Sequence, residues 1–257
     1  MIVALNYRIE GRGQRILLLH PVGLDLTFFD SLVAELVSHY QILRVDLRGH
    51  GLSPGGENDE KPQIQDFAED VHALLCVLGF RPTAVVGLSF GGMVAQELVL
   101  HHPGDASALV ASACGSAFSE ETRKVLYERG IAAEKHGMAS LLDSTMDRWF
   151  TPAFRERGED AAARERLLRN NIQNWKKTWQ AISGLDTAPR LHTISIPTLC
   201  LAAENDLSTP PAVVRALADA IPGARFVVVP KTPHMLFLEV PQIVGSVIRN
   251  FLESTLP

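Results

Sequence analysis

The chain has 257 residues, of which 46% are hydrophobic, and a formal net charge of −5. These values suit one α/β core with an insertion, and no long Lys/Arg run is present that would favour nucleic acid or an anionic membrane as a partner. Three scattered cysteines argue against a zinc site or a disulfide framework, and their apolar surroundings predict buried free thiols at Cys76, Cys114 and Cys200. The N-terminus alternates like a strand and does not resemble a signal peptide, so we expect a cytoplasmic protein without a membrane segment.

Apolar runs recur along the chain with amphipathic stretches between them. The predicted strands cover residues 15–20, 41–46, 83–88, 108–113, 197–202 and 225–230. Their continuous apolar character is typical of strands buried on both faces of a parallel sheet. Residues 64–78 carry apolar side chains at helical spacing. The alternation of strands and helices predicts an α/β fold with a doubly wound, mostly parallel sheet.

The alternation of predicted strands and helices stops between the strands at 108–113 and 197–202. Residues 116–189 contain no convincing buried strand and are rich in charged residues and tryptophan. We interpret this stretch as a mostly helical lid inserted into a core made of residues 1–115 and 190–257.

The sequence "VVGLSFGGM" places Ser89 inside Gly-x-Ser-x-Gly, between a predicted strand and a predicted helix. This pattern is typical of a nucleophile elbow, in which small neighbours permit a tight turn that exposes the serine hydroxyl. The alternative is that Ser89 is only a small residue at a tight turn. A serine hydroxyl is a poor nucleophile at neutral pH, so the first interpretation requires a base and an acid elsewhere in the chain.

The base and the acid are expected at the ends of the last two strands. His234 follows the strand at 225–230, and Asp206 follows the strand at 197–202, with Glu204 as the alternative acid. An acid in this position would orient the histidine and stabilise its protonated form. The chain order Ser89, Asp206, His234 is the order of an α/β-hydrolase triad. Two further carboxylates remain available, Asp186 and Asp46, and for Asp46 we expect a structural role in the "DLRGHG" turn with Arg48 and His50 as partners.

An enzyme that attacks a carbonyl with serine also needs two backbone donors for the oxyanion. The amide that follows the nucleophile belongs to Phe90, and the loop after the strand at 15–20 offers the amide of Val22. Pro21 precedes Val22 and has no N–H, but the required donor is the next residue. Pro21 is equally well explained as an ordinary turn residue.

These motifs resemble the α/β-hydrolase superfamily over nearly the whole chain. "HPVGLDLTFFDSL", "DLRGHGLSP", "GLSFGG" and "LSTPP…IPGARFVVVPKTPH" occur in the expected order. The resemblance implies Ser89 as nucleophile, Asp206 as acid and His234 as base, with Val22 and Phe90 as backbone donors. It implies no cofactor and no metal.

A finer resemblance comes from the predicted lid. "EKHGMASLLDSTMDRWFTPAFRE" and "WQAISGLDT" are similar to the lid of 3-oxoadipate enol-lactonases. That family hydrolyses a small enol-lactone with a free carboxylate in the β-ketoadipate route of aromatic degradation. The resemblance implies that Arg148 and Trp149 face the site, where a guanidinium could pair with the substrate carboxylate. The alternatives are a solvated helix residue for Arg148 and a plain core residue for Trp149.

The sequence therefore predicts a cofactor-free serine hydrolase, a monomer or homodimer, whose partner is a small ester or lactone, possibly carboxylate-bearing. The leading substrate is 3-oxoadipate enol-lactone. A generic carboxylesterase and a carbon–carbon bond hydrolase of meta-cleavage products are the alternatives within this class. A non-catalytic ligand receptor on the same fold is the alternative outside it.

Overall fold

Seven strands form one sheet within residues 2–56 and 61–255, the part of the chain that the computed structural model describes. They are β1 (Tyr7–Gly11), β2 (Gln14–Leu19), β3 (Tyr40–Val45), β4 (Thr83–Leu88), β5 (Ala106–Ser112), β6 (Thr198–Ala203) and β7 (Arg225–Val229). Their order across the sheet is β1-β3-β2-β4-β5-β6-β7. β1 runs antiparallel to β3, and all other neighbouring pairs are parallel. The predicted α/β fold with a mostly parallel sheet is confirmed.

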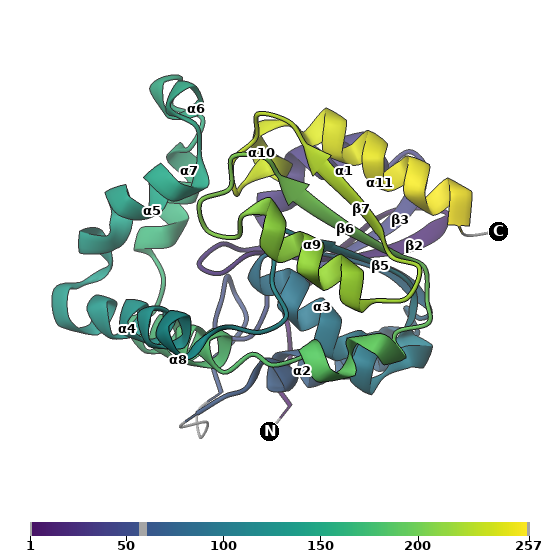
Figure 1. Cartoon of the computed structure of the whole chain (residues 1–257), viewed down its shortest axis with the longest axis horizontal. Coiled ribbons are helices and arrows are strands. Elements are labelled where there is room, and N and C mark those ends of the chain that lie inside the picture. The colour runs from purple at the N-terminus through teal and green to yellow at the C-terminus, as the bar shows by residue number, and fades with distance from the viewer. Residues whose placement is uncertain (1, 57–60, 256–257) are drawn as a thin grey trace.

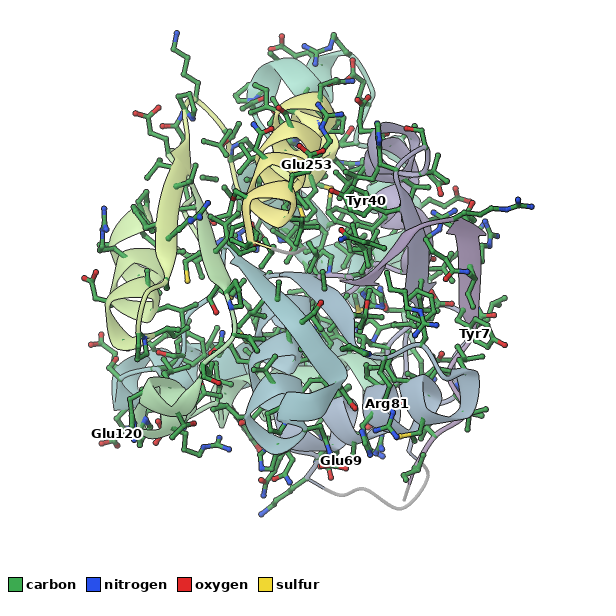
Figure 2. All side chains as sticks on the ribbon, turned by 90° about the vertical axis from the view of Figure 1, so that its right-hand side faces the viewer. Tyr7, Tyr40, Glu69, Arg81, Glu120 and Glu253 are labelled. Carbon is green, nitrogen blue, oxygen red and sulfur yellow. The ribbon has the colours of Figure 1, made fainter. Side chains whose placement is uncertain are left out.

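The strands that are buried along their whole length are the ones that the sequence pattern predicts most clearly. Every residue of β4 and β6 is buried, as their unbroken runs of apolar and small side chains require. β1 forms one edge, and most of its residues are exposed, including Tyr7 at the right-hand side of Figure 2. The alternating N-terminal stretch therefore contributes only five residues to the sheet.

Helices cover both faces of the sheet (Figure 1). They are α1 (Asp30–Leu36) and α11 (Pro241–Thr255), which pack against each other on one face, and α2 (Ile64–Leu78), α3 (Phe90–His101) and α9 (Pro211–Ala220) on the other. A short helix, α10 (Leu236–Glu239), precedes α11. α2 has the predicted bounds. The prediction of a buried thiol at Cys76 is wrong, because this residue lies on the outer face of α2, whereas Cys114 and Cys200 are buried.

The chain between β5 and β6 is helical, as the sequence predicts for residues 116–189. It contains α4 (Glu120–His136), α5 (Leu142–Trp149), α6 (Pro152–Glu156), α7 (Ala161–Leu168) and α8 (Ile172–Ser183). We call residues 116–189 the helical segment. An isolated bridge between Ala117 and Asp186 joins its two ends. In the described residues, no helix of this segment or of the core is both long and apolar enough to cross a membrane.

The helical segment contacts loops that follow strands of the core (Figure 1). The backbone amide of Met235 donates to the carbonyl oxygen of Trp149 at 3.0 Å. The side-chain amide of Asn170 donates to the carbonyl oxygen of Gly23 at 2.8 Å. Because Met235 follows β7 and Gly23 follows β2, these contacts place the segment beyond the carboxyl ends of the parallel strands.

Candidate active site

Ser89 occupies a strained turn between β4 and α3. Its backbone has φ 54° and ψ −116°, in the left-handed half of conformational space that side chains rarely adopt. A Cβ atom added at Gly91 would lie 2.0 Å from the carbonyl oxygen of Leu19, and one added at Gly87 would lie 2.2 Å from the carbonyl oxygen of Gly91. The two glycines of the motif therefore permit a close crossing of β4, α3 and β2, which fixes the serine in place.

His234 connects the serine to the predicted acid. Its Nε2 atom lies 2.9 Å from Ser89 Oγ, and its Nδ1 atom lies 2.7 Å from Asp206 Oδ2. A carboxylate only accepts hydrogen bonds, so Nδ1 carries the proton and Nε2 is left to accept the serine hydroxyl. His234 and Asp206 are each 3% exposed. The structure thus brings Ser89, Asp206 and His234 into one hydrogen-bonded chain at the carboxyl edge of the sheet.

The carboxylate of Asp206 is held by its own loop. One oxygen accepts the amides of Ser208 at 2.7 Å and Thr209 at 2.9 Å, and the hydroxyl of Thr209 lies 2.8 Å from the other oxygen. Burial acts to raise the pKa of Asp206, but the electrostatic effect of the neighbouring His234 ring and the hydrogen bonds from His234 and Thr209 outweigh it and hold the pKa below its usual value. Glu204, the alternative acid, is exposed and accepts the amide of Lys231 instead.

Two backbone amides are the predicted donors to an oxyanion. Phe90 directly follows Ser89 at the start of α3, and Val22 lies in the loop after β2. Both residues are buried. Among the described turn, loop and cap hydrogen bonds, none uses the amide of Val22 or of Phe90. Both N–H groups therefore have unused donor capacity, as an oxyanion site requires.

His20 connects the loop that carries Val22 to the loop after β3 through hydrogen bonds at both ring nitrogens. Its Nδ1 atom lies 2.8 Å from the carbonyl oxygen of Pro21, and its Nε2 atom accepts the amide of Leu47 at 2.9 Å. One nitrogen must donate and the other must accept, so the ring is neutral. Burial lowers the pKa of His20 to about 4, which agrees with this geometry.

A second buried histidine supports Phe90. The ring of His50 stacks on the ring of Phe90 with centroids 5.7 Å apart, and it lies 5.1 Å from the ring of His20. Burial, with a smaller contribution from His20, lowers the pKa of His50 to about 3. No sequence motif singles out His20, and its position directly before Pro21 and Val22 is the one signal that could have found it.

The partners expected for Asp46 are not the ones observed. Its carboxylate accepts the amides of Leu26 and Leu52, each at 2.8 Å, and the side chain of Asn6 at 2.7 Å. Arg48 pairs with Asp70 instead, with Nε 2.6 Å from a carboxylate oxygen. Asp46 therefore has the expected structural role, but it joins three loops and not the side chains of its own turn.

The two residues suggested by the lid resemblance have different environments. Trp149 is 5% exposed, and its carbonyl oxygen binds the amide of Met235, the residue after His234. Arg148 lies on the exposed side of α5. The geometry thus places Trp149 beside the loop of the histidine and leaves Arg148 nearer to solvent.

A group of potential metal ligands lies elsewhere in the molecule. His72, His102 and Asp105 present ligand atoms within 4.8 Å of one another. These atoms already have protein partners: His72 binds Asp105 at 2.6 Å, and His102 binds Glu69 at 3.0 Å. Figure 2 labels Glu69 at this end of the molecule, together with Arg81, which pairs with Asp105. His102 and Asp105 follow the C-terminal end of α3, whereas Ser89 precedes its N-terminal end. We therefore assign this group no role in catalysis.

Comparisons with known proteins give the family of the chain and its similarity to solved structures. Residues 16–245 match the family described as the alpha/beta hydrolase family. The chain is 27% identical to 3-oxoadipate enol-lactonase 2 of Acinetobacter baylyi, covering 98% of this chain and 94% of that protein. It is also 27% identical to the pimeloyl-[acyl-carrier protein] methyl ester esterase of Aeromonas hydrophila, covering 94% and 96%. The solved enol-lactonase from Burkholderia xenovorans LB400 superposes with a TM-score of 0.91 at 28% identity, covering 98% and 97%.

The fold and the family match define the class of protein. The chain belongs to the alpha/beta hydrolase family. It is a hydrolase of the ester- or lactone-cleaving kind, and it resembles the 3-oxoadipate enol-lactonases in sequence and in structure.

Proposed function

We propose that this protein is a serine hydrolase that opens a small carboxylate-bearing lactone, with 3-oxoadipate enol-lactone as the leading substrate. The observation that carries the proposal is the hydrogen-bonded chain from Ser89 Oγ through His234 to Asp206, with contacts of 2.9 and 2.7 Å. The substrate is suggested by the enol-lactonases among its relatives and by their solved structure.

The first half of the reaction forms an acyl-enzyme. Ser89 Oγ attacks the lactone carbonyl carbon while its proton passes to His234 Nε2. The carbonyl oxygen becomes an oxyanion and is stabilised by the amides of Val22 and Phe90. When the tetrahedral intermediate collapses, the bond from the carbonyl carbon to the ring oxygen breaks. The leaving enolate oxygen takes the proton from His234. The enol that results later tautomerises to a ketone.

The second half releases the acid. A water molecule gives a proton to His234 Nε2 and attacks the acyl carbon, and the second tetrahedral intermediate expels Ser89 Oγ, which recovers the proton. Asp206 remains ionised throughout and stabilises the imidazolium ion that forms in each half. The depressed pKa of Asp206 supports this role, because the carboxylate is charged at neutral pH.

The helical segment has the position of a lid in this proposal. Residues 1–115 and 190–257 would form the core that carries the triad, and residues 116–189 would close over it. The contacts of Trp149 with Met235 and of Asn170 with Gly23 support the division, because they connect the segment to the loops of His234 and Val22. A closed segment would exclude bulk water from the oxyanion.

The decisive experiment compares kcat/KM for 3-oxoadipate enol-lactone, generated in situ, with kcat/KM for a short p-nitrophenyl ester. A strong preference for the enol-lactone supports the proposal. Good ester turnover without enol-lactone turnover would favour the carboxylesterase alternative, which the relationship to a methyl ester esterase suggests. Binding of either compound without turnover would favour a receptor.

A further inference from the structure

Two chains connect the helical segment to the core, and both meet at α3, the helix that follows Ser89. The entering chain, residues 113–118, comes directly after β5, and the leaving chain, residues 184–187, comes directly after α8. The amide of Thr187 on the leaving chain donates to the carbonyl oxygen of Ser116 on the entering chain at 2.8 Å. The two chains are therefore joined to each other where they pass α3.

The side chain of Gln96, on α3, binds both connecting chains. It is fully buried, with 0% of its surface exposed. Its Nε2 atom donates to the carbonyl oxygen of Gly115 at 3.1 Å and lies 3.4 Å from Cys114 Sγ, both on the entering chain. Its Oε1 atom accepts the hydroxyl of Thr187, on the leaving chain, at 2.6 Å. One carboxamide thus holds the point where the chain enters the helical segment and the point where it leaves.

The residues directly before Gly115 contact the candidate triad. The carbonyl oxygen of Ser112 accepts the amide of Ser89 at 2.8 Å. The carbonyl oxygen of Ala113 lies 2.8 Å from the hydroxyl of Thr209, the residue that also contacts the carboxylate of the acid. A shift of the entering chain would therefore reach both the nucleophile and the loop of the acid.

A glutamine at this buried position has a cost that an apolar residue would avoid. A primary amide loses its hydration when it is buried, and hydrogen bonds must replace that hydration. Both polar atoms of Gln96 have partners in this structure. A methionine of similar length could fill the same space, but it would let the two chains slide over α3. The directional bonds of the carboxamide permit one arrangement of the chains.

We infer that Gln96 is a positioning residue, whose carboxamide fixes the helical segment relative to Ser89 by holding both connecting chains on α3. Through Thr187 it sets how closely the segment covers the site. Through Gly115 it prevents movements of the segment from displacing the carbonyl groups that contact the nucleophile and the loop of the acid. This inference rests on the proposed role of the helical segment as a lid, and it assigns Gln96 no contact with substrate.

The tryptophans of the chain report on the position of the helical segment. The chain has three, Trp149, Trp175 and Trp179, and all lie in this segment and are buried. Two of them contact loops of the core. The carbonyl oxygen of Trp149 accepts the amide of Met235, and a Cβ atom added at Gly23 would lie 2.7 Å from the ring of Trp175. Looser closure should therefore make tryptophan fluorescence more accessible to quenching by acrylamide.

The main test is a matched pair of substitutions at Thr187. Thr187→Val removes the hydroxyl that binds Gln96 and keeps the size of the side chain, whereas Thr187→Ser keeps the hydroxyl. For Thr187→Val we expect KM for a short p-nitrophenyl ester to rise about fivefold, the size expected for one net hydrogen bond, with a smaller change in kcat and a larger acrylamide quenching constant. Thr187→Ser should remain close to the wild type in all three quantities.

Gln96→Met removes both halves of the carboxamide. It should reproduce the effects of Thr187→Val and also lower kcat by about 5- to 10-fold, because the entering chain is released as well. Thr198→Val is the control, since Thr198 is buried at the start of β6 and its hydroxyl likewise donates to a backbone carbonyl oxygen, that of Ile196. This control should leave KM and the quenching constant unchanged.

The outcomes separate the role of Gln96 from the identity of the substrate. Unchanged KM and quenching in Thr187→Val would overturn the inference, as would equal effects in Thr187→Ser. Amide hydrogen exchange in Thr187→Val should quicken in the helical segment and not in β4, and equal quickening in β4 would show a general loss of stability and reject the inference. Absence of enol-lactone turnover in the wild type would reject the proposed substrate, while quenching and ester kinetics would still decide the role of Gln96.

Discussion

The carboxyl edge of the sheet and the interior of the helical segment differ in whether their buried polar side chains have hydrogen-bond partners. At the sheet edge, the side chain of Asp206 has four hydrogen-bond contacts, and His20 uses both ring nitrogens. In the helical segment, the Nε1 atom of Trp179 is buried without a hydrogen-bond partner. At the sheet edge each of these polar side chains has hydrogen-bond partners, whereas the helical segment leaves a buried indole N–H without one.

The difference separates chemistry from recognition. Charges that must act on every turnover are best held rigidly, because a preorganised group does not need to reorganise during the reaction. Donors that recognise a substrate are left unpaired until it arrives, at some cost in stability. We therefore expect changes at the sheet edge to affect the chemical step, and changes in the helical segment to affect the choice of substrate.

Removing the nucleophile tests the first half of this comparison most strongly. Ser89→Ala should lower kcat for a p-nitrophenyl ester by about 10⁴-fold or more, because no other hydroxyl contacts His234 Nε2 in the described residues. Ser195→Ala is a suitable control, since Ser195 is exposed and precedes β6, whereas Asp206 follows that strand at the other edge of the sheet. Activity retained in Ser89→Ala would mean that the chemistry is not located at this turn.

Removing the charge of the acid should have the next largest effect. Asp206→Asn should lower kcat by about 10³- to 10⁴-fold, because an amide cannot stabilise the imidazolium and favours the wrong tautomer. Thr209→Val keeps the carboxylate and removes one contact to it, so a loss of only a few-fold is expected. Steady-state kinetics on one ester measures both variants, and similar losses in the two would contradict the role of the charge.

The close crossing at the elbow predicts an effect on stability. Gly91→Ala would place a Cβ atom 2.0 Å from a backbone oxygen of β2 that cannot move easily, so we expect the free energy of unfolding to fall by about 3 kcal/mol or more. Gly104→Ala is the matched control, because nothing lies within 4 Å of its added Cβ. Urea denaturation of both variants measures the difference, and equal midpoints would show that the sheet edge is not tightly packed.

Much of the sheet edge could be predicted from the sequence because topology determines it. Parallel strands end at one edge, so residues that follow β4, β6 and β7 must lie near each other, and these are Ser89, Asp206 and His234. The surrounding support was less visible. Whether Thr209 reaches Asp206 or His20 reaches Leu47 depends on loop conformations that no periodic pattern encodes.

The interior of the helical segment was largely hidden from sequence analysis. Arg129 lies in a charged helical stretch that is typical of a solvated face, and only the packing of α4 on α8 reveals that its guanidinium lies over the ring of Trp179. The prediction of a buried thiol at Cys76 was wrong for a related reason, because an apolar run on an amphipathic helix still has an exposed side. Helical periodicity predicts that a face is buried but not which helix covers it.

The pH dependence of stability gives the smallest effect and again separates the two regions. His20 and His50 keep neutral rings in the fold, with pKa values of about 4 and about 3, whereas both titrate near 6.5 in the unfolded chain. Between pH 6.5 and 4, both rings are therefore protonated in the unfolded chain but neutral in the folded chain. Because the unfolded state binds more protons, the free energy of unfolding falls as the pH falls, by up to about 1.4 kcal/mol per pH unit for each ring. The depressed pKa of Asp206 adds a loss in the same direction only at lower pH, below its unfolded value of 3.8.

Urea denaturation at pH 7, 6 and 5 measures this slope directly. The double variant His20→Asn/His50→Asn should be less stable at pH 7, yet its free energy of unfolding should change less with pH than that of the wild type. His136→Asn, at the exposed end of α4, is the matched control and should leave the slope unchanged. Equal slopes in the wild type and the double variant would show that the rings beside Val22 and Phe90 are protonated in the fold. The hydrogen bond from the amide of Leu47 to His20 Nε2 could not then exist, and the oxyanion loop would need another support.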